Sequence, residues 1–141
     1  MAKAEGDRGM GRLMEALLLR VESFSDSIID ISERAMRERK MNRIAEQISA
    51  CGTSVGANTY EADEAMSRAD FARAVAIVLK ELNESRFWVR TCMRRQWVPL
   101  ADAAPVDAEA AELKSIFGAI LSRTRANGLK KSADPARSAR A

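Results

Sequence analysis

Apolar residues recur at alternating spacings of three and four along four stretches of the chain. This spacing is typical of α-helices that bury one narrow face against partner helices. The first three stretches last for three heptads or more, and the fourth is shorter. The inward positions are Met14, Leu17, Val21, Phe24, Ile28, Ile31 and Ala35; then Met41, Ile44, Ile48, Cys51, Val55, Asn58, Ala62 and Ala65; then Phe71, Val75, Val78, Leu82, Ser85, Val89 and Cys92; and finally Val106, Ala110, Leu113, Phe117 and Ile120.

Capping residues and prolines mark the boundaries of these helices. Ser67, with Asp70 three residues later, resembles a capping box, so the second helix should end near Met66 and the third begin after it. The connector from Pro99 to Pro105 should not continue a helix smoothly, and Asp107 can cap the fourth helix after it. Short links make successive helices antiparallel, so we predict an all-α, up-down-up-down four-helix bundle.

One polar segment competes with this prediction. Residues 51–59 read CGTSVGANT, a composition that by propensity suits a loop or a strand. The heptad spacing nevertheless passes through the segment, and Gly52 and Gly56 lie one turn apart, where a neighbouring helix can approach closely. We therefore favour a tightly packed helix. No Walker lysine follows the glycines, so the segment is not predicted to hold phosphate.

Asn58 lies on the predicted buried face of this helix. An unpaired buried amide costs about 1 to 3 kcal/mol, so its side chain needs a partner. Asn58 lies level with residues 76–80 of the third helix, and either Glu81 or a backbone carbonyl could accept its amide hydrogen. We interpret Asn58 and Glu81 as buried polar residues that fix the helix register, in preference to a ligand site.

Composition limits the chemistry that is available. The chain has 141 residues with 47% apolar, which suits one domain, and its longest apolar run, Ala74 to Leu79, is too short to cross a bilayer. It has no histidine and two cysteines, Cys51 and Cys92, which excludes histidine triads and four-cysteine zinc sites. We expect a cytoplasmic protein, not an enzyme, with no membrane contact, no cofactor and no metal. The remaining enzymatic alternative, the least favoured, is a divalent cation shared by Glu61, Glu64, Glu81 and Glu84.

Charge is distributed unevenly along the chain. Residues 1–121 hold 17 Lys or Arg against 19 Asp or Glu, whereas residues 122–141 hold six against one. We therefore predict a flexible N-terminus over residues 1–10, a bundle over 11–126 and a basic disordered tail over 127–141.

The middle of the chain carries a resemblance to a known family. Its matching residues are Gln47 and Ile48, the run from Gly52 to Asn58, Glu61, Ala62, Ser67, Asp70, Phe71, Lys80, Glu81 and the run from Glu84 to Trp88. This pattern resembles the four-helix bundle proteins whose founding members are encoded by intervening sequences in bacterial 23S ribosomal RNA genes. Family members often have Arg-Ser-Gly where Ala50-Cys51-Gly52 stands here, and commonly a Tyr-Trp pair where this chain has Phe87-Trp88. The resemblance implies an antiparallel bundle without known catalysis, often assembled as a five-fold ring, a pentamer. A distant relative, the accessory protein of diversity-generating retroelements, engages reverse transcriptase and nucleic acid.

Two sets of surface residues are candidates for binding. An up-down bundle brings two groups of cations to one end, which we predict to contact nucleic acid, either RNA or DNA, or an acidic protein: Arg34, Arg37, Arg39, Lys40, Arg43, Arg90, Arg94 and Arg95. Outward apolar residues on neighbouring faces indicate a contact between subunits: Leu19, Ile29, Tyr60, Ile77 and Phe87. Stacking of bases on Phe87 is the alternative role for that side chain.

The expected function is therefore that of a homo-oligomeric binding module with a positive pole. The alternative is a purely structural oligomer whose charges serve only solubility.

Overall fold

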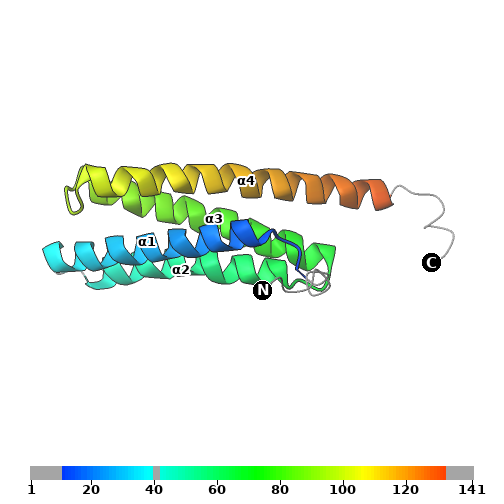
Figure 1. Cartoon of the computed structure of the whole chain (residues 1–141), viewed down its shortest axis with the longest axis horizontal. Helices are drawn as coiled ribbons and strands as arrows, with labels where there is room; N and C mark the ends of the chain where they lie inside the picture. The colour runs from blue at the N-terminus through cyan, green and yellow to red at the C-terminus, as the bar shows by residue number, and fades with distance from the viewer. Residues whose placement is uncertain (1–10, 40–41, 133–141) are drawn as a thin grey trace, which may run out of the picture.

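A computed structural model describes residues 11–39 and 42–132. These residues form four α-helices and no strand: α1 (Glu15–Arg39), α2 (Asn42–Asp63), α3 (Arg68–Arg94) and α4 (Leu100–Ser132). Each helix runs antiparallel to the one before it (Figure 1). The predicted four-helix bundle is confirmed.

The core lies where the apolar faces of the four helices meet. Most described positions at the predicted spacing are fully or almost fully buried, and burying each large apolar side chain stabilises the fold by about 1.5 to 3 kcal/mol. The largest of them are Phe24 and Ile28 of α1, Ile48 and Val55 of α2, Val75, Val78, Leu82 and Val89 of α3, and Leu113 and Phe117 of α4.

The glycine-bearing segment lies inside α2, as the heptad spacing predicted. Its polar side chains donate to carbonyls one turn back, Thr59 to Val55 at 2.7 Å and Thr53 to Ser49 at 2.8 Å, which satisfies them within the helix. A Cβ atom on Gly52 would lie 2.3 Å from Ile28 Cγ2. Only glycine permits α1 and α2 to approach this closely.

Asn58 finds its hydrogen-bond partner, a backbone carbonyl, within its own helix and not at Glu81. Its side chain is half-buried, and Nδ2 donates to the Ser54 carbonyl of its own helix at 2.9 Å rather than to α3. Thr59 occupies the buried position instead. The reason is that 3.6 residues per turn drift against a strict heptad, so the core face moves by one residue late in α2. Glu81 is also half-buried.

The start of α3 agrees with the boundary predicted from the sequence, and the start of α4 does not. Ser67 caps α3 as predicted, its hydroxyl accepting from the Asp70 amide at 3.1 Å. In contrast, α4 begins at Leu100 and contains Pro105. The carbonyl that Pro105 leaves without a donor belongs to Ala101, an exposed residue that water can solvate. The predicted capping role of Asp107 is wrong, because Asp107 lies inside α4. Its carboxylate instead accepts a hydrogen bond from Arg86 Nε at 2.9 Å.

The last helix is longer than the sequence predicted. α4 continues beyond Ala126 to Ser132, so the first residues of the predicted tail are helical. The predicted flexible segment 1–10 and the remaining tail residues 133–141 lie outside the described residues. No helix in the described part of the chain is long and apolar enough to cross a membrane.

Candidate nucleic-acid interface

The end of the bundle at which α1 and α3 terminate collects the predicted cations. Arg34 and Arg37 lie in the last turns of α1, Arg43 in the first turn of α2, and Arg90, Arg94 and Arg95 around the end of α3. Arg39 closes α1, but its side chain, like the whole of Lys40, lies outside the described residues. The topology therefore brings the described members of the set to one end.

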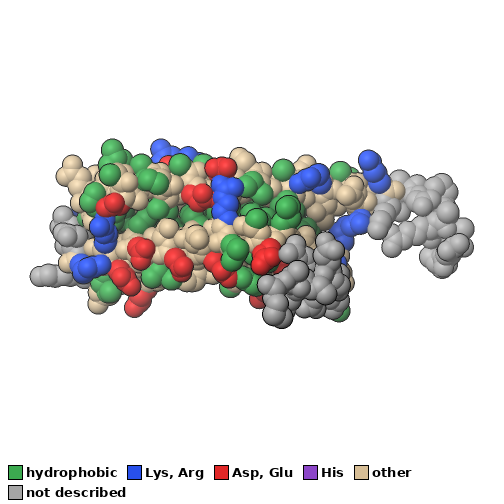
Figure 2. Space-filling view, in the orientation of Figure 1, with side chains coloured by type: hydrophobic (Ala, Val, Ile, Leu, Met, Phe, Trp, Pro, Cys, Tyr) green, Lys and Arg blue, Asp and Glu red, His purple; other side chains and the backbone are tan. Residues whose placement is uncertain are grey.

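The α1 part of this end is not uniformly positive. Arg34 forms an ion pair with Asp102 of α4, and Arg37 lies 4.0 Å from the Glu33 carboxylate. In Figure 2 basic and acidic side chains intermingle near this end of α1 and α4. These pairings weaken the field that a polyanion would meet there.

The α3 part of this end is different. Asn83, Arg86, Phe87, Arg90 and Arg94 follow one another along one outer face of the helix and line a hollow of about 280 Å³. Within the described ranges, no carboxylate lines this hollow. Asn83 was not among the binding residues predicted from the sequence.

The arginines of this hollow are held to different degrees. Asp107 fixes Arg86 from α4, and Arg94 Nη2 donates to the Thr91 hydroxyl at 3.1 Å. Arg90 is exposed and makes no ion pair with any residue in the described ranges. The hollow therefore has one anchored cation at its side and two that are free to contact phosphate.

Phe87 provides a stacking surface between these cations. Its ring meets Trp88 edge-on, with ring centroids 5.2 Å apart and an interplanar angle of 69°, yet 55% of the residue remains exposed. An exposed aromatic face among arginines is the arrangement with which single-stranded nucleic acid is bound, because every base has a π-face. The structure thus groups Phe87 with Arg90 and Arg94.

The other apolar surface residues lie apart from this hollow. Leu19 of α1 and Tyr60 of α2 are 56% and 43% exposed, whereas Ile29 and Ile77 are half-buried. The Tyr60 hydroxyl donates to the Glu22 carboxylate, and this anionic partner raises the pKa of the phenol. Leu19 and Tyr60 mark the α1–α2 edge, which is opposite the edge formed by α3 and α4.

The buried thiols and the carboxylates are the remaining candidates for chemistry. Burial raises the pKa of Cys51 and of Cys92 to about 11, so both stay protonated near neutral pH. No group of three or more potential metal ligands occurs among the residues that the structure describes.

Comparisons with known proteins agree with this fold. Residues 19–119 match the family model described as 23S rRNA-intervening sequence protein. A solved protein of unknown function from Bacteroides thetaiotaomicron, assigned to the S23 ribosomal protein family, is 28% identical, with a TM-score of 0.70 over 74% of this chain and 97% of that one. No curated protein matches the chain. The family model covers most of the helical bundle, and the chain therefore belongs to the 23S rRNA-intervening sequence protein family.

Proposed function

We propose that this protein is a non-catalytic, self-associating bundle that binds single-stranded RNA or DNA through the outer face of α3. The observation that carries the proposal is the hollow in which Phe87 is surrounded by Arg86, Arg90, Arg94 and Asn83, with no carboxylate among its lining residues. The arginines supply contacts to phosphates, and the ring supplies a stacking platform.

The expected energetics of such a site are measurable. Stacking of one base on an exposed aromatic ring contributes about 1 to 3 kcal/mol. Each phosphate neutralised on a single strand contributes about −0.7 to the slope of log affinity against log salt. Contacts from Arg90 and Arg94 alone therefore predict a slope of about −1.4 per protein copy.

The test measures fluorescence anisotropy of labelled oligouridine and oligothymidine across a salt series. The double variant Arg90→Glu, Arg94→Glu should lose most of the binding, and Phe87→Leu should weaken binding without changing the salt slope. Arg73→Glu is the matched control, because Arg73 is exposed on the same helix but outside the hollow.

Equal losses from Arg73→Glu and from either single variant, Arg90→Glu or Arg94→Glu, which make the same charge change, would show non-specific charge attraction and would reject the site. Absence of any binding at low salt would favour the alternative function, a purely structural oligomer. Binding that is unaffected by Phe87→Leu would remove the stacking role but leave the phosphate contacts.

The α1–α2 edge supports the proposed self-association. Leu19, Met36 and Tyr60 are large apolar residues that are more than 40% exposed on α1 and α2. Exposed acidic residues interrupt this surface on α1, namely Glu22, Asp26, Asp30 and Glu33. Pairing the edge with itself would bring like charges together, so we infer a head-to-tail contact with a different face, which closes into rings when the rotation permits.

Self-association has a separate test. Light scattering of the purified chain should give a mass above that of the 15.5 kDa monomer. Leu19→Lys should lower that mass, whereas Ala119→Lys, at an exposed position of α4 away from this edge, serves as the control for added charge. A monomer in wild type would reject the contact but leave the α3 site intact.

A further inference from the structure

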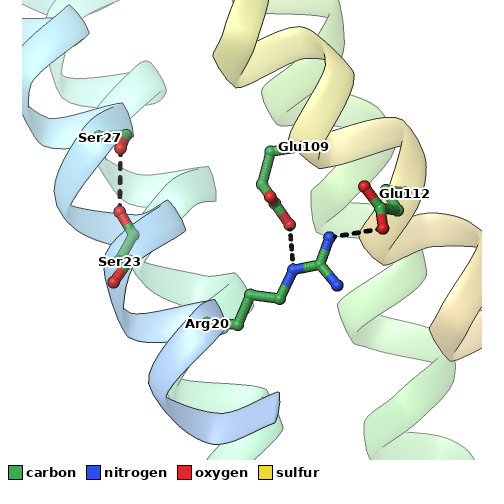
Figure 3. Close-up of polar contacts among 5 residues, drawn as sticks. All are labelled: Arg20, Ser23, Ser27, Glu109 and Glu112. Atoms are coloured by element: carbon green, nitrogen blue, oxygen red, sulfur yellow. Dashed lines mark hydrogen bonds and ion pairs between the residues drawn. The ribbon is translucent and has the colours of Figure 1, made fainter. Parts of the chain in front are cut away.

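The corner between α1 and α4 is only partly closed. α4 packs along α3 but meets α1 at few points, and the far end of α4 extends past the start of α1 (Figure 1). Arg20 bridges the corner, with Nε 2.7 Å from Glu109 and Nη2 2.9 Å from Glu112 (Figure 3). Beyond this bridge the corner opens into a hollow of about 660 Å³ between α1 and α4.

The walls of this α1–α4 hollow are mainly apolar. Leu13, Leu17 and Phe71 line it from one side, and Ile116 and Ile120 of α4 line it from the other. Figure 2 shows hydrophobic side chains exposed between α1 and α4 beside the basic side chain that crosses the corner. Its volume lies within the range of about 300 to 1,000 Å³ that is usual for small-molecule sites.

The polar residues of the hollow carry one sign of charge. Arg12, Arg20 and Arg123 line it, and no Asp or Glu of the described residues does. The two glutamates of α4 neutralise Arg20. In contrast, among the described residues the Arg12 guanidinium donates to the neutral Ala65 carbonyl, with Nε 2.8 Å from the oxygen, and lies 5.7 Å from the centre of the Phe71 ring. Exposed Arg123 makes no ion pair in the described part of the chain.

We propose that this hollow binds a free, single-chain amphipathic carboxylate, with its apolar tail between α1 and α4 and its headgroup at Arg12 and Arg123. An apolar wall with two uncompensated guanidinium groups is complementary to that chemistry. The α4 wall from Ile116 to Asn127 is about 16 Å long, which suits a medium-length chain. The Arg20 bridge closes one end, so a partner helix cannot lie along the whole corner.

Calorimetric titration of the full chain with decanoate below its micelle concentration tests the proposal. We expect saturable binding of one decanoate per chain, together with a rise in melting temperature. Acetate has no tail and should not bind. Decyltrimethylammonium has the same tail and the opposite charge, and should bind at least about ten-fold more weakly.

Two matched variants place the ligand. Arg123→Glu should weaken decanoate binding by about ten-fold or more, because it puts a carboxylate beside the headgroup. Arg125→Glu makes the same charge change at an exposed α4 position that does not line the hollow, and should leave binding unchanged. Ile120→Trp should fill the hollow and block binding, with far-UV circular dichroism confirming that the variant is folded.

Several outcomes would overturn the proposal. These are equal binding of decanoate and the cationic amphiphile, binding without saturation, and equal effects of the Arg123 and Arg125 variants. Absence of decanoate binding would also overturn it, and would leave a second copy of the chain as the occupant. The double variant at Arg90 and Arg94 should bind decanoate normally, which separates this site from the proposed nucleic-acid site.

Discussion

Replacing Gly52 with alanine should force α1 and α2 apart and destabilise the bundle. The new Cβ atom would lie 2.3 Å from Ile28 Cγ2 and 2.5 Å from Ile28 Cβ. Carbon atoms in contact are normally about 3.5 to 4.0 Å apart, so the two helices would have to separate locally by about 1 Å. Ile28 cannot rotate away, because its Cβ is fixed to the backbone of α1.

The magnitude follows from three opposing effects. Overpacking of a tight core costs about 1 to 3 kcal/mol. Separation of the helices also strains the hydrogen bond from the Ser25 hydroxyl to the Gly52 carbonyl, 2.8 Å long and worth about 1 kcal/mol. Alanine returns about 1 kcal/mol through its higher helix propensity. The net loss in the free energy of unfolding is therefore about 1 to 3 kcal/mol.

Urea unfolding followed by circular dichroism at fixed protein concentration measures this loss. Gly118→Ala in α4 is the matched control, because its Cβ would meet no atom within 4 Å and the substitution should stabilise by about 1 kcal/mol. Equal stabilisation by the two substitutions would refute the close approach of α1 and α2 at Gly52.

Three further substitutions test other parts of the fold. Gln96 has a φ of 57°, so Gln96→Gly should stabilise by about 1 kcal/mol in the same urea assay. Burial, and secondarily Glu84, raises the pKa of Glu81, so the fold loses stability as pH rises above the ordinary carboxyl pKa. Glu81→Gln should therefore melt higher than wild type at neutral pH, and the difference should vanish at about pH 3, below the ordinary carboxyl pKa. Arg20→Met removes two half-exposed ion pairs and should cost no more than about 1 kcal/mol, because such pairs are screened by water.

The sequence predicted the features that depend on local pattern. The apolar spacing predicted four helices, and Ser67 predicted the cap of α3. The glycine pair predicted that another helix would approach α2 closely. These signals are local because each depends on residues within one or two turns. The start of α4 was mispredicted, because a proline is tolerated in a helix where the orphaned carbonyl of Ala101 is exposed to water.

The features that depend on how helices sit against each other did not follow from the pattern. Met14 continues the apolar spacing of α1 but is 76% exposed and precedes the helix, where it lines the open hollow between α1 and α4. The pairing of Arg34 with Asp102 likewise depends on where α4 begins. To predict the hollow around Phe87, one would need to know both which residues lie on the outward face of α3 and where α4 places Asp107.

Ultraviolet cross-linking of oligouridine to the full-length protein, followed by mass spectrometric mapping, tests the binding site most directly. We predict that the main cross-linked peptide contains Phe87, and that the double variant Arg90→Glu, Arg94→Glu abolishes the cross-link. Cross-links confined to the α1–α2 edge or to the C-terminal tail would contradict it.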